Sequence, residues 1–226
     1  MSGWVTTIIA ALIGAGVGSI GAEYLKDYFR RKAEQRNEQL QHEAEIQRVQ
    51  KKLVQQYLLQ LQDAIESLWY RLDNVKNRGG RAVMKDRYFE VSTLYALGRV
   101  LAYERILILD GIYPQLEDVN QALGNFLKTR LQNIDSQLSK GEFQRYNRLA
   151  LAEAVMEREE GRLRTSTYMD FRHHYEGTNS LVEVSLEPAK RFIAALKGPE
   201  VAGLLDELRR TAERLGSVTR IPTTIK

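Results

Sequence analysis

Residues 23–75 contain neither proline nor glycine, and this uninterrupted run constrains the fold more than any other feature of the sequence. Glu, Gln, Lys, Arg, Leu and Ala dominate the run, and all of these residues favour the α-helix. An α-helix rises about 1.5 Å per residue, so a continuous helix over the run is about 80 Å long. The sequence therefore predicts a long helical stalk that continues into a helical core.

The apolar pattern divides this run into two parts. Residues 33–52 are polar almost all round, which is typical of a solvent-bridging helix or a weak coiled coil. After a one-step phase slip near Leu53–Val54, the large apolar residues alternate spacings of three and four and form a heptad seam. The seam consists of Leu58, Leu61, Ile65, Leu68, Leu72 and Val75. We place the polar stalk at 23–57 and expect the seam to pack against later helices of the same chain, the alternative being pairing with a second copy.

Residues 1–22 carry no charged side chain, and the first charge is Glu23. About 20 apolar residues are enough to cross a hydrocarbon core of about 30 Å. A cleaved signal peptide does not fit, because no Lys or Arg precedes the apolar run and Ile20 occupies a position where cleavage requires a small residue. We predict a single uncleaved transmembrane helix over 1–22. The alternative is a buried or peripheral helix of a soluble protein.

Basic residues gather immediately after this segment, at Lys26, Arg30, Arg31, Lys32 and Arg36, whereas the short N-terminal flank has none. The positive-inside rule then predicts a cell-membrane protein whose N-terminus lies outside and whose C-terminal domain is cytoplasmic. Arg30, Arg31 and Lys32 are expected to contact anionic lipid head groups.

Small residues follow one face of the predicted membrane helix. Ala10, Gly14, Gly18 and Ala22 form a small-xxx-small ladder, and Gly21 lies on the same face. Such a ladder lets two helix backbones approach closely in lipid. It predicts packing between transmembrane helices and a homo-oligomer, the alternative being a plain anchor whose glycines have no packing role.

The remainder of the chain is predicted to be helical, so the fold class is all-α. Asn77-Arg-Gly-Gly80 is a turn signal, and helical spacing of apolar residues follows it repeatedly. The predicted helices cover 83–109, 115–138, 142–160, 185–196 and 199–215. Residues 161–180 are left open between helix and strand. We assign a helical bundle domain to 58–216 and a flexible tail to 217–226.

Composition excludes several kinds of chemistry. The chain has no cysteine, which removes disulfides, thiolate metal sites and a cysteine nucleophile. Its 33 Lys and Arg nearly balance its 29 Asp and Glu, which argues against a dedicated polyanion-binding protein. Phosphate-binding glycine loops and HExxH are also absent from the sequence. We expect no cofactor and no metal.

Two clusters of charged residues suggest alternative functions. A helical metal-dependent hydrolase would use Glu153, Glu157, Asp170 and His173, but a di-metal bundle needs Glu-x-x-His from two helices and the sequence offers only one Asp-x-x-His. We therefore interpret these residues as surface charges and predict that the protein is not an enzyme.

The second cluster is basic and surrounds the Gly-Gly turn, close to Trp69 and Tyr70. Its members are Lys76, Arg78, Arg81, Lys85 and Arg87. Cations beside aromatic rings are a weak signature of anion or nucleic-acid binding. They support an alternative function as a helical binding module for an anionic ligand, with nucleic acid the less expected partner.

The leading hypothesis is a non-enzymatic, single-pass, membrane-anchored helical protein. It would act by self-association and by recruiting or sensing a partner at the cytoplasmic membrane face, as a scaffold, tether or membrane effector. The expected partners are membrane lipid, further copies of the chain and an unidentified protein.

Overall fold

The computed structural model of the protein describes residues 3–139, 143–177, 181–196 and 198–225, with side chains from residue 28 onward except that of residue 181. These residues are predominantly helical, which confirms the all-α class. Two compact units divide the chain, Met1–Val49 and Gln50–Lys226.

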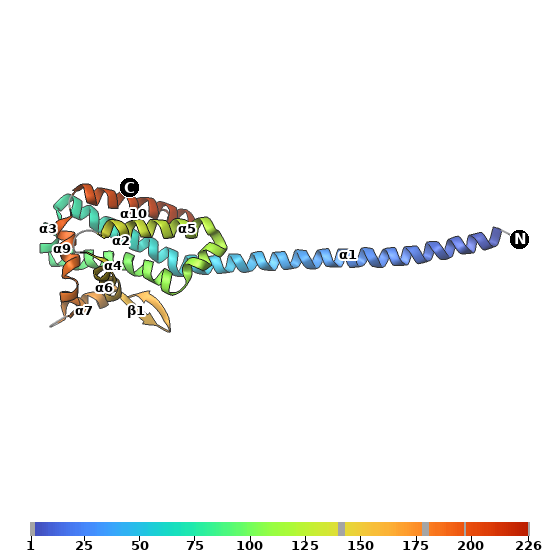
Figure 1. Ribbon diagram of the computed structural model, residues 1–226, viewed down its shortest axis with the longest axis horizontal. Coiled ribbons are helices and arrows are strands. Elements are labelled where there is room, and N and C mark those ends of the chain that lie inside the picture. Colours follow the sequence, from blue (N-terminus) through green and yellow to red (C-terminus); the bar gives the residue numbers. More distant parts are fainter. Residues whose placement is uncertain (1–2, 140–142, 178–180, 197, 226) are drawn as a thin grey trace. The chain divides into compact units, whose positions relative to one another are not determined.

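The first unit belongs to one helix, α1 (Gly3–Leu53), which Figure 1 draws without interruption. Its side chains are exposed from Tyr28 through Glu45, as expected for a polar stalk. No helix in the described part of the chain is both long and apolar enough to cross a membrane. The predicted transmembrane helix over 1–22 is therefore not supported.

A π-helical turn, η1 (Val54–Leu58), separates α1 from α2 (Leu59–Arg78). A π-turn closes its hydrogen bond from residue i to residue i+5, and so brings residues five apart towards one side. Leu53 and Leu58 have this spacing, and both are buried. The π-turn is the predicted phase slip near Leu53–Val54, and it confirms that prediction.

Every residue of the predicted heptad seam is buried in the second unit. Helix α2 packs along α10 (Gly198–Thr219) and also contacts α4 (Arg87–Leu109), an arrangement that can be followed in Figure 1. The seam therefore forms intramolecular core, and pairing of the seam between two copies is not supported. Each fully buried leucine of this kind stabilises the fold by about 1.5–3 kcal/mol.

The predicted turn at Asn77–Gly80 is confirmed. Gly79 has a positive φ of 80°, which glycine adopts readily, and it joins α2 to the short helix α3 (Gly80–Lys85). Helix α4 begins at Arg87, later than the predicted position 83, because Asp86 has an extended backbone and caps the helix. Its Oδ1 accepts the N–H groups of Tyr88 at 3.1 Å and Phe89 at 3.4 Å.

Helix α5 (Ile112–Leu138) consists of two helices joined at Asn120, whose φ of −156° and ψ of 87° are not helical. The Asn120 side chain accepts the backbone N–H of Leu123 at 3.1 Å and so caps the second part. The helix begins before the predicted position 115, after Gly111, which has a left-handed φ of 63°.

The predicted helix 142–160 is wrong in its second half. Helix α6 (Arg145–Ala154) ends early, and β1 (Met156–Glu159) and β2 (Arg162–Thr165) form an antiparallel hairpin, visible in Figure 1. Glu160 and Gly161 both have positive φ, which is what a tight two-residue hairpin turn requires. Within the described part of 161–180, the chain is thus strand and then helix.

That helix is α7 (Tyr168–Glu176), capped by Thr167, whose Oγ1 accepts the backbone N–H of Asp170 at 3.2 Å. Two short helices, α8 (Leu181–Ser185) and α9 (Glu187–Ala195), precede α10. Gly80 of α3 packs so closely on α9 that a Cβ there would lie 2.1 Å from the Ile193 carbonyl oxygen.

The C-terminal tail differs from the predicted flexible segment. Helix α10 continues to Thr219, and the following residues bind to α2. Gln62 Nε2 donates to the Ile221 carbonyl at 3.0 Å, and the Tyr70 hydroxyl donates to the Thr224 carbonyl at 2.7 Å. Thr224 also donates its backbone N–H to Glu66 at 3.3 Å. Polar side chains on α2 therefore hold the tail in place.

Candidate functional site

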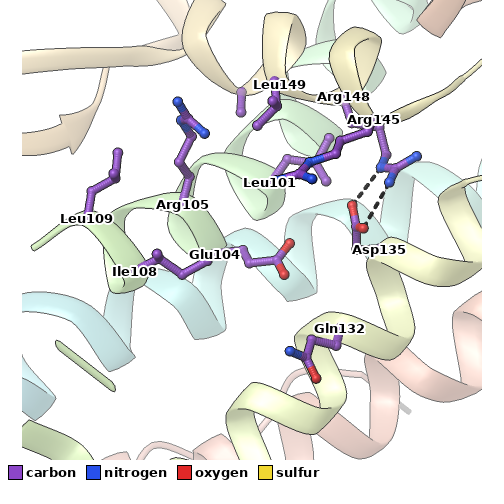
Figure 2. Close-up of a pocket in the computed structure, with 11 residues that line it drawn as sticks. Leu101, Glu104, Arg105, Ile108, Leu109, Gln132, Asp135, Arg145, Arg148 and Leu149 are labelled. Carbon is purple, nitrogen blue, oxygen red and sulfur yellow. Dashed lines mark hydrogen bonds and ion pairs between the residues drawn. The ribbon is translucent and has the colours of Figure 1, made fainter. Parts of the chain in front are cut away.

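Helices α4, α5 and α6 enclose a cleft of about 450 Å³, hereafter the α4–α5–α6 cleft (Figure 2). This volume is within the range of small-ligand sites, about 300–1,000 Å³. The lining residues are Leu101, Glu104, Arg105, Ile108 and Leu109 of α4, Gln132 and Asp135 of α5, and Arg145, Arg148, Leu149 and Ala152 of α6.

Helical spacing and one glycine create this cleft. Positions 101, 104, 105 and 108 share a face of α4, since residues three and four apart lie above one another on a helix. Gly98, about one turn earlier, lets α6 approach, because a Cβ there would lie 2.5 Å from Val155 Cγ2 and 3.2 Å from the Leu151 carbonyl oxygen. The two helices are therefore in close contact beside the cleft.

Arg148 and Asp135 fix the wall that α5 and α6 share. Arg148 Nε donates to Asp135 Oδ1 at 2.6 Å and Nη2 donates to Oδ2 at 2.9 Å, the two-pronged geometry drawn in Figure 2. Its Nη1 donates to the Phe143 carbonyl at 2.8 Å. The Arg148 side chain is 8% exposed and that of Asp135 is 34% exposed, so the guanidinium is buried while the carboxylate still reaches water.

Glu104 is the unusual group of the cleft. Neither a hydrogen bond nor an ion pair joins its carboxyl to another side chain that the structure describes. Burial, together with the negative charge of Asp135, raises the pKa of Glu104 from 4.5 to about 7, although Arg148 opposes the rise. Glu104 in turn adds to the effect of burial in raising the pKa of Tyr113. Near neutral pH the cleft thus contains a carboxyl group that changes charge.

The other charges differ in how far they are neutralised. Arg105 Nη2 lies 3.1 Å from Glu153 Oε1, whereas Arg145 is exposed and has no carboxylate at ion-pair distance among the described residues. Ile108 and Leu109 are more than half exposed at the rim. The cleft therefore offers an unpaired guanidinium, a titrating carboxyl and apolar surface, a combination that suits an amphipathic ligand or segment.

The structure leaves the predicted basic cluster on the surface. Lys76, Arg78, Arg81, Lys85 and Arg87 are all exposed. Arg87 is neutralised, because its Nη1 lies 2.7 Å from Glu90 Oε1 and 3.0 Å from Glu183 Oε1, and its Nε lies 3.6 Å from Glu176 Oε1. Arg78 lies 3.9 Å from Asp86 and 4.3 Å from the Phe89 ring centroid. The positive charge available to an anion there is correspondingly smaller than the sequence suggests.

The predicted membrane-contacting residues fall on α1. Arg30, Arg31 and Lys32 are exposed, with Arg30 3.7 Å from Glu34 and Lys32 6.0 Å from the Tyr28 ring centroid. The side chains of the predicted packing ladder, Ala10, Gly14, Gly18, Gly21 and Ala22, lie outside the described ones.

The carboxylates of the hydrolase alternative do not come together on one helix. Glu153 lies on α6, Glu157 on β1 and Glu160 in the hairpin turn, so these three carboxylates share no helical face. Glu157 instead accepts from Arg164 across the hairpin at 2.7 Å. Asp170 accepts from Thr167 at the start of α7.

The histidines lie apart from these carboxylates. His42, His173 and His174 are all exposed, and none of them lines the α4–α5–α6 cleft. Among the described residues no group of three or more His, Cys, Asp or Glu is placed to hold a metal ion.

In the sequence, Glu104 and Arg105 stand out only as charges within an otherwise apolar stretch, and no pattern singles out Asp135, Arg145 or Arg148. A lone carboxylate among apolar residues is a usable signal, because burial of an unpaired charge is costly. No pattern in the sequence indicates that Arg148 pairs with Asp135.

Comparison of the chain with protein-family models, with curated proteins and with solved structures finds no match.

Proposed function

We propose that the protein is a non-enzymatic, membrane-attached helical protein that recruits or senses a partner at the cytoplasmic face of the membrane. One observation carries the proposal. A single continuous helix, α1, contains both the uncharged segment 3–22 and the exposed basic residues Arg30, Arg31 and Lys32. An apolar helical segment followed directly by cations is the pattern of a membrane anchor whose basic flank contacts anionic head groups.

The second unit supplies the recruiting or sensing part of the proposal. It has its own buried core and an open cleft in which apolar and charged groups alternate. Exposed Ile108 and Leu109 line the same cleft as Arg145, which favours an amphipathic partner that makes apolar contact with the leucine and isoleucine and a charge-assisted hydrogen bond with the arginine.

Membrane attachment is tested by carbonate extraction of cells that express the full-length chain. The decisive variant is Ile9→Arg with Ile13→Arg, since each arginine near the centre of a membrane helix costs about 3 kcal/mol. Its matched control is Gln39→Arg with Gln47→Arg, which adds the same charge at exposed positions of α1.

We expect the unaltered chain and the control variant to remain in the membrane pellet. The Ile9→Arg, Ile13→Arg variant and a truncation to residues 23–226 should appear in the supernatant. Extraction of the unaltered full-length chain by carbonate would contradict the proposal.

The same proposal includes self-association through the small-residue ladder. Gly14→Leu with Gly18→Leu fills the face on which two helix backbones would meet, and we expect it to abolish crosslinked oligomers in membranes. Ile9→Leu with Ile13→Leu alters the opposite, bulky face and is expected to leave crosslinking unchanged. Equal crosslinking of both variants argues against the ladder as the contact.

A further inference from the structure

A second, smaller pocket of about 210 Å³ lies among helices α2, α4 and α7. We call it the tyrosine–arginine pocket. Its polar lining comprises Ser67 and Arg71 of α2, Tyr88, Ser92, Tyr95 and Arg99 of α4, and Tyr168 of α7. None of the described residues that line it is acidic. The pocket shares no lining residue with the α4–α5–α6 cleft.

Arg71 brings a charge that no carboxylate neutralises at ion-pair distance among the described residues. Aromatic rings hold its guanidinium, whose Cζ lies 5.1 Å from the Tyr88 ring centroid and 5.7 Å from that of Phe89. Its Nη2 donates to the Tyr88 hydroxyl at 3.1 Å. Because that hydroxyl accepts from Arg71, its own proton is available to donate to a ligand.

Arg99 brings a second guanidinium that is only partly satisfied. Its side chain is 15% exposed, and Nη1 lies 2.8 Å from Asp63 Oδ2. Its Nε is buried and has no hydrogen-bond partner among the described residues. Arg99 lines the pocket and adds positive charge to it, whereas its Nε has almost no exposed surface and is not a contact for a ligand.

The hydroxyl groups of the pocket fall into two sets. Tyr95 donates to the Ser166 carbonyl at 2.7 Å, and Ser92 donates to the Tyr88 carbonyl at 2.6 Å, so both already have acceptors. Ser67, Tyr88 and Tyr168 also line the pocket, and their hydroxyl groups donate no hydrogen bond to the described residues.

We propose that the tyrosine–arginine pocket binds the phosphate group of a small phosphomonoester. Arg71 and Arg99 would supply the charge, and Tyr88 and Tyr168 further hydrogen bonds. Two guanidinium groups and several hydroxyl donors exceed what the two oxygens of a carboxylate accept. A phosphomonoester fits better, because it carries about two negative charges and three strong acceptor oxygens, and the planar guanidinium matches its geometry.

This site is separate from the basic cluster 76–87 that the sequence indicated for anions. It is also independent of membrane attachment and of the α4–α5–α6 cleft. A soluble phosphomonoester and a lipid with a phosphomonoester head group present the same chemistry to the pocket.

The test is calorimetric titration of the purified full-length chain, in non-ionic detergent at pH 7.5, with inorganic phosphate and with acetate. The main variant is Arg71→Gln, which removes a charge that forms no ion pair with the described residues. The matched control is Arg81→Gln, which removes an exposed charge from the nearby basic cluster. Urea unfolding of each variant checks that it is folded.

We expect saturable phosphate binding that is weakened about tenfold or more by Arg71→Gln and is unchanged by Arg81→Gln, since hydrogen bonds to charged groups contribute strongly. If Arg71→Gln does not fold, Tyr88→Phe with Tyr168→Phe decides, because it keeps both charges and is expected to weaken binding several-fold. Absence of saturable phosphate binding, equally tight acetate binding or equal loss in the two arginine variants would overturn the proposal.

Two further titrations distinguish the sources of the phosphate group. Glycerol phosphate represents soluble phosphomonoesters, and a short-chain phosphatidate represents lipids. Binding of glycerol phosphate within a few-fold of the phosphatidate supports a soluble ligand, whereas a phosphatidate that binds more than tenfold tighter supports a lipid head group. Failure of both to compete with inorganic phosphate overturns the phosphomonoester assignment.

Discussion

Replacing Glu104 by glutamine should stabilise the protein at alkaline pH and have little effect at acidic pH. Glu104 is half-buried in the α4–α5–α6 cleft, and burial together with Asp135 raises its pKa from 4.5 to about 7. The folded protein therefore favours the neutral carboxyl. Glutamine keeps nearly the same shape and cannot ionise, so the variant isolates the effect of the charge.

The magnitude follows from proton linkage. Below pH 4.5 the carboxyl is neutral in both states and contributes no difference. Between pH 4.5 and about 7 the folded chain holds the proton that the unfolded chain has lost, so the free energy of unfolding falls as the pH rises. Each tenfold difference in proton affinity is worth about 1.4 kcal/mol, which gives a total loss of about 3 kcal/mol above pH 7. The Gln variant lacks this loss.

Urea unfolding at pH 4.5 and pH 8, followed by circular dichroism, measures the effect. We expect Glu104→Gln to match the unaltered chain at the lower pH and to be more stable by about 3 kcal/mol at the higher. Glu213→Gln, at an exposed position of α10, is the matched control and should change stability by less than about 0.5 kcal/mol at either pH. A Glu104→Gln variant whose stability parallels that of the unaltered chain at both pH values would refute the reasoning.

Three further predictions concern the core, a helix contact and the tail. Leu68→Ala should lower the free energy of unfolding by about 2–5 kcal/mol, because Leu68 is fully buried. Leu40→Ala, at a largely exposed position, should change it by less than about 0.5 kcal/mol in the same urea titration. Gly80→Ala should lower the free energy of unfolding by about 1–3 kcal/mol, because its Cβ would meet the backbone of α9. Gly203→Ala in α10 is the control, since the nearest atom to its Cβ is 3.8 Å away, and it should leave the thermal melting temperature unchanged or raise it. Although burial raises the pKa of Glu66, its hydrogen bonds from Thr224 and Gln62 lower it overall, so the tail should be held at neutral pH and released as the pH falls. The protection factor of the Ile225 amide, which is its hydrogen-exchange rate corrected for the intrinsic rate at each pH, should fall at low pH in the unaltered chain. In Glu66→Ala it should be low at neutral pH as well.

The sequence predicted the α2 seam and the phase slip near Leu53–Val54 because both follow from apolar spacing within one segment. Residues that alternate spacings of three and four bury one face of a helix whatever packs on them. Leu53 and Leu58 break that spacing, and a π-turn is a simple way to keep both residues in the core. The same spacing does not say which helix covers the seam. That α10 and α4 do so is a property of the whole chain.

The hairpin could not be predicted in this way, because its strands lack an apolar alternation. Met156–Glu159 and Arg162–Thr165 are mostly charged, and a cross-strand ion pair between Glu157 and Arg164 stabilises them. The strands also read as a continuation of the helical pattern that precedes them. The Glu160–Gly161 dipeptide was the single local sign of a tight turn.

The candidate sites are least predictable from sequence, yet helix α4 gives them a common physical origin. This helix is largely apolar, so each charged residue in its buried part requires compensation. The charge of Arg105 is compensated by an ion pair with Glu153, an exposed partner that the sequence does not identify. The charge of Arg99 is compensated by an ion pair between its Nη1 and Asp63, while its buried Nε has no hydrogen-bond partner among the described residues. Glu104 forms no ion pair with the described residues, and burial together with Asp135 raises its pKa to about 7. The two incompletely compensated charges of α4, on Arg99 and Glu104, therefore each line one of the two pockets proposed to bind a partner or ligand.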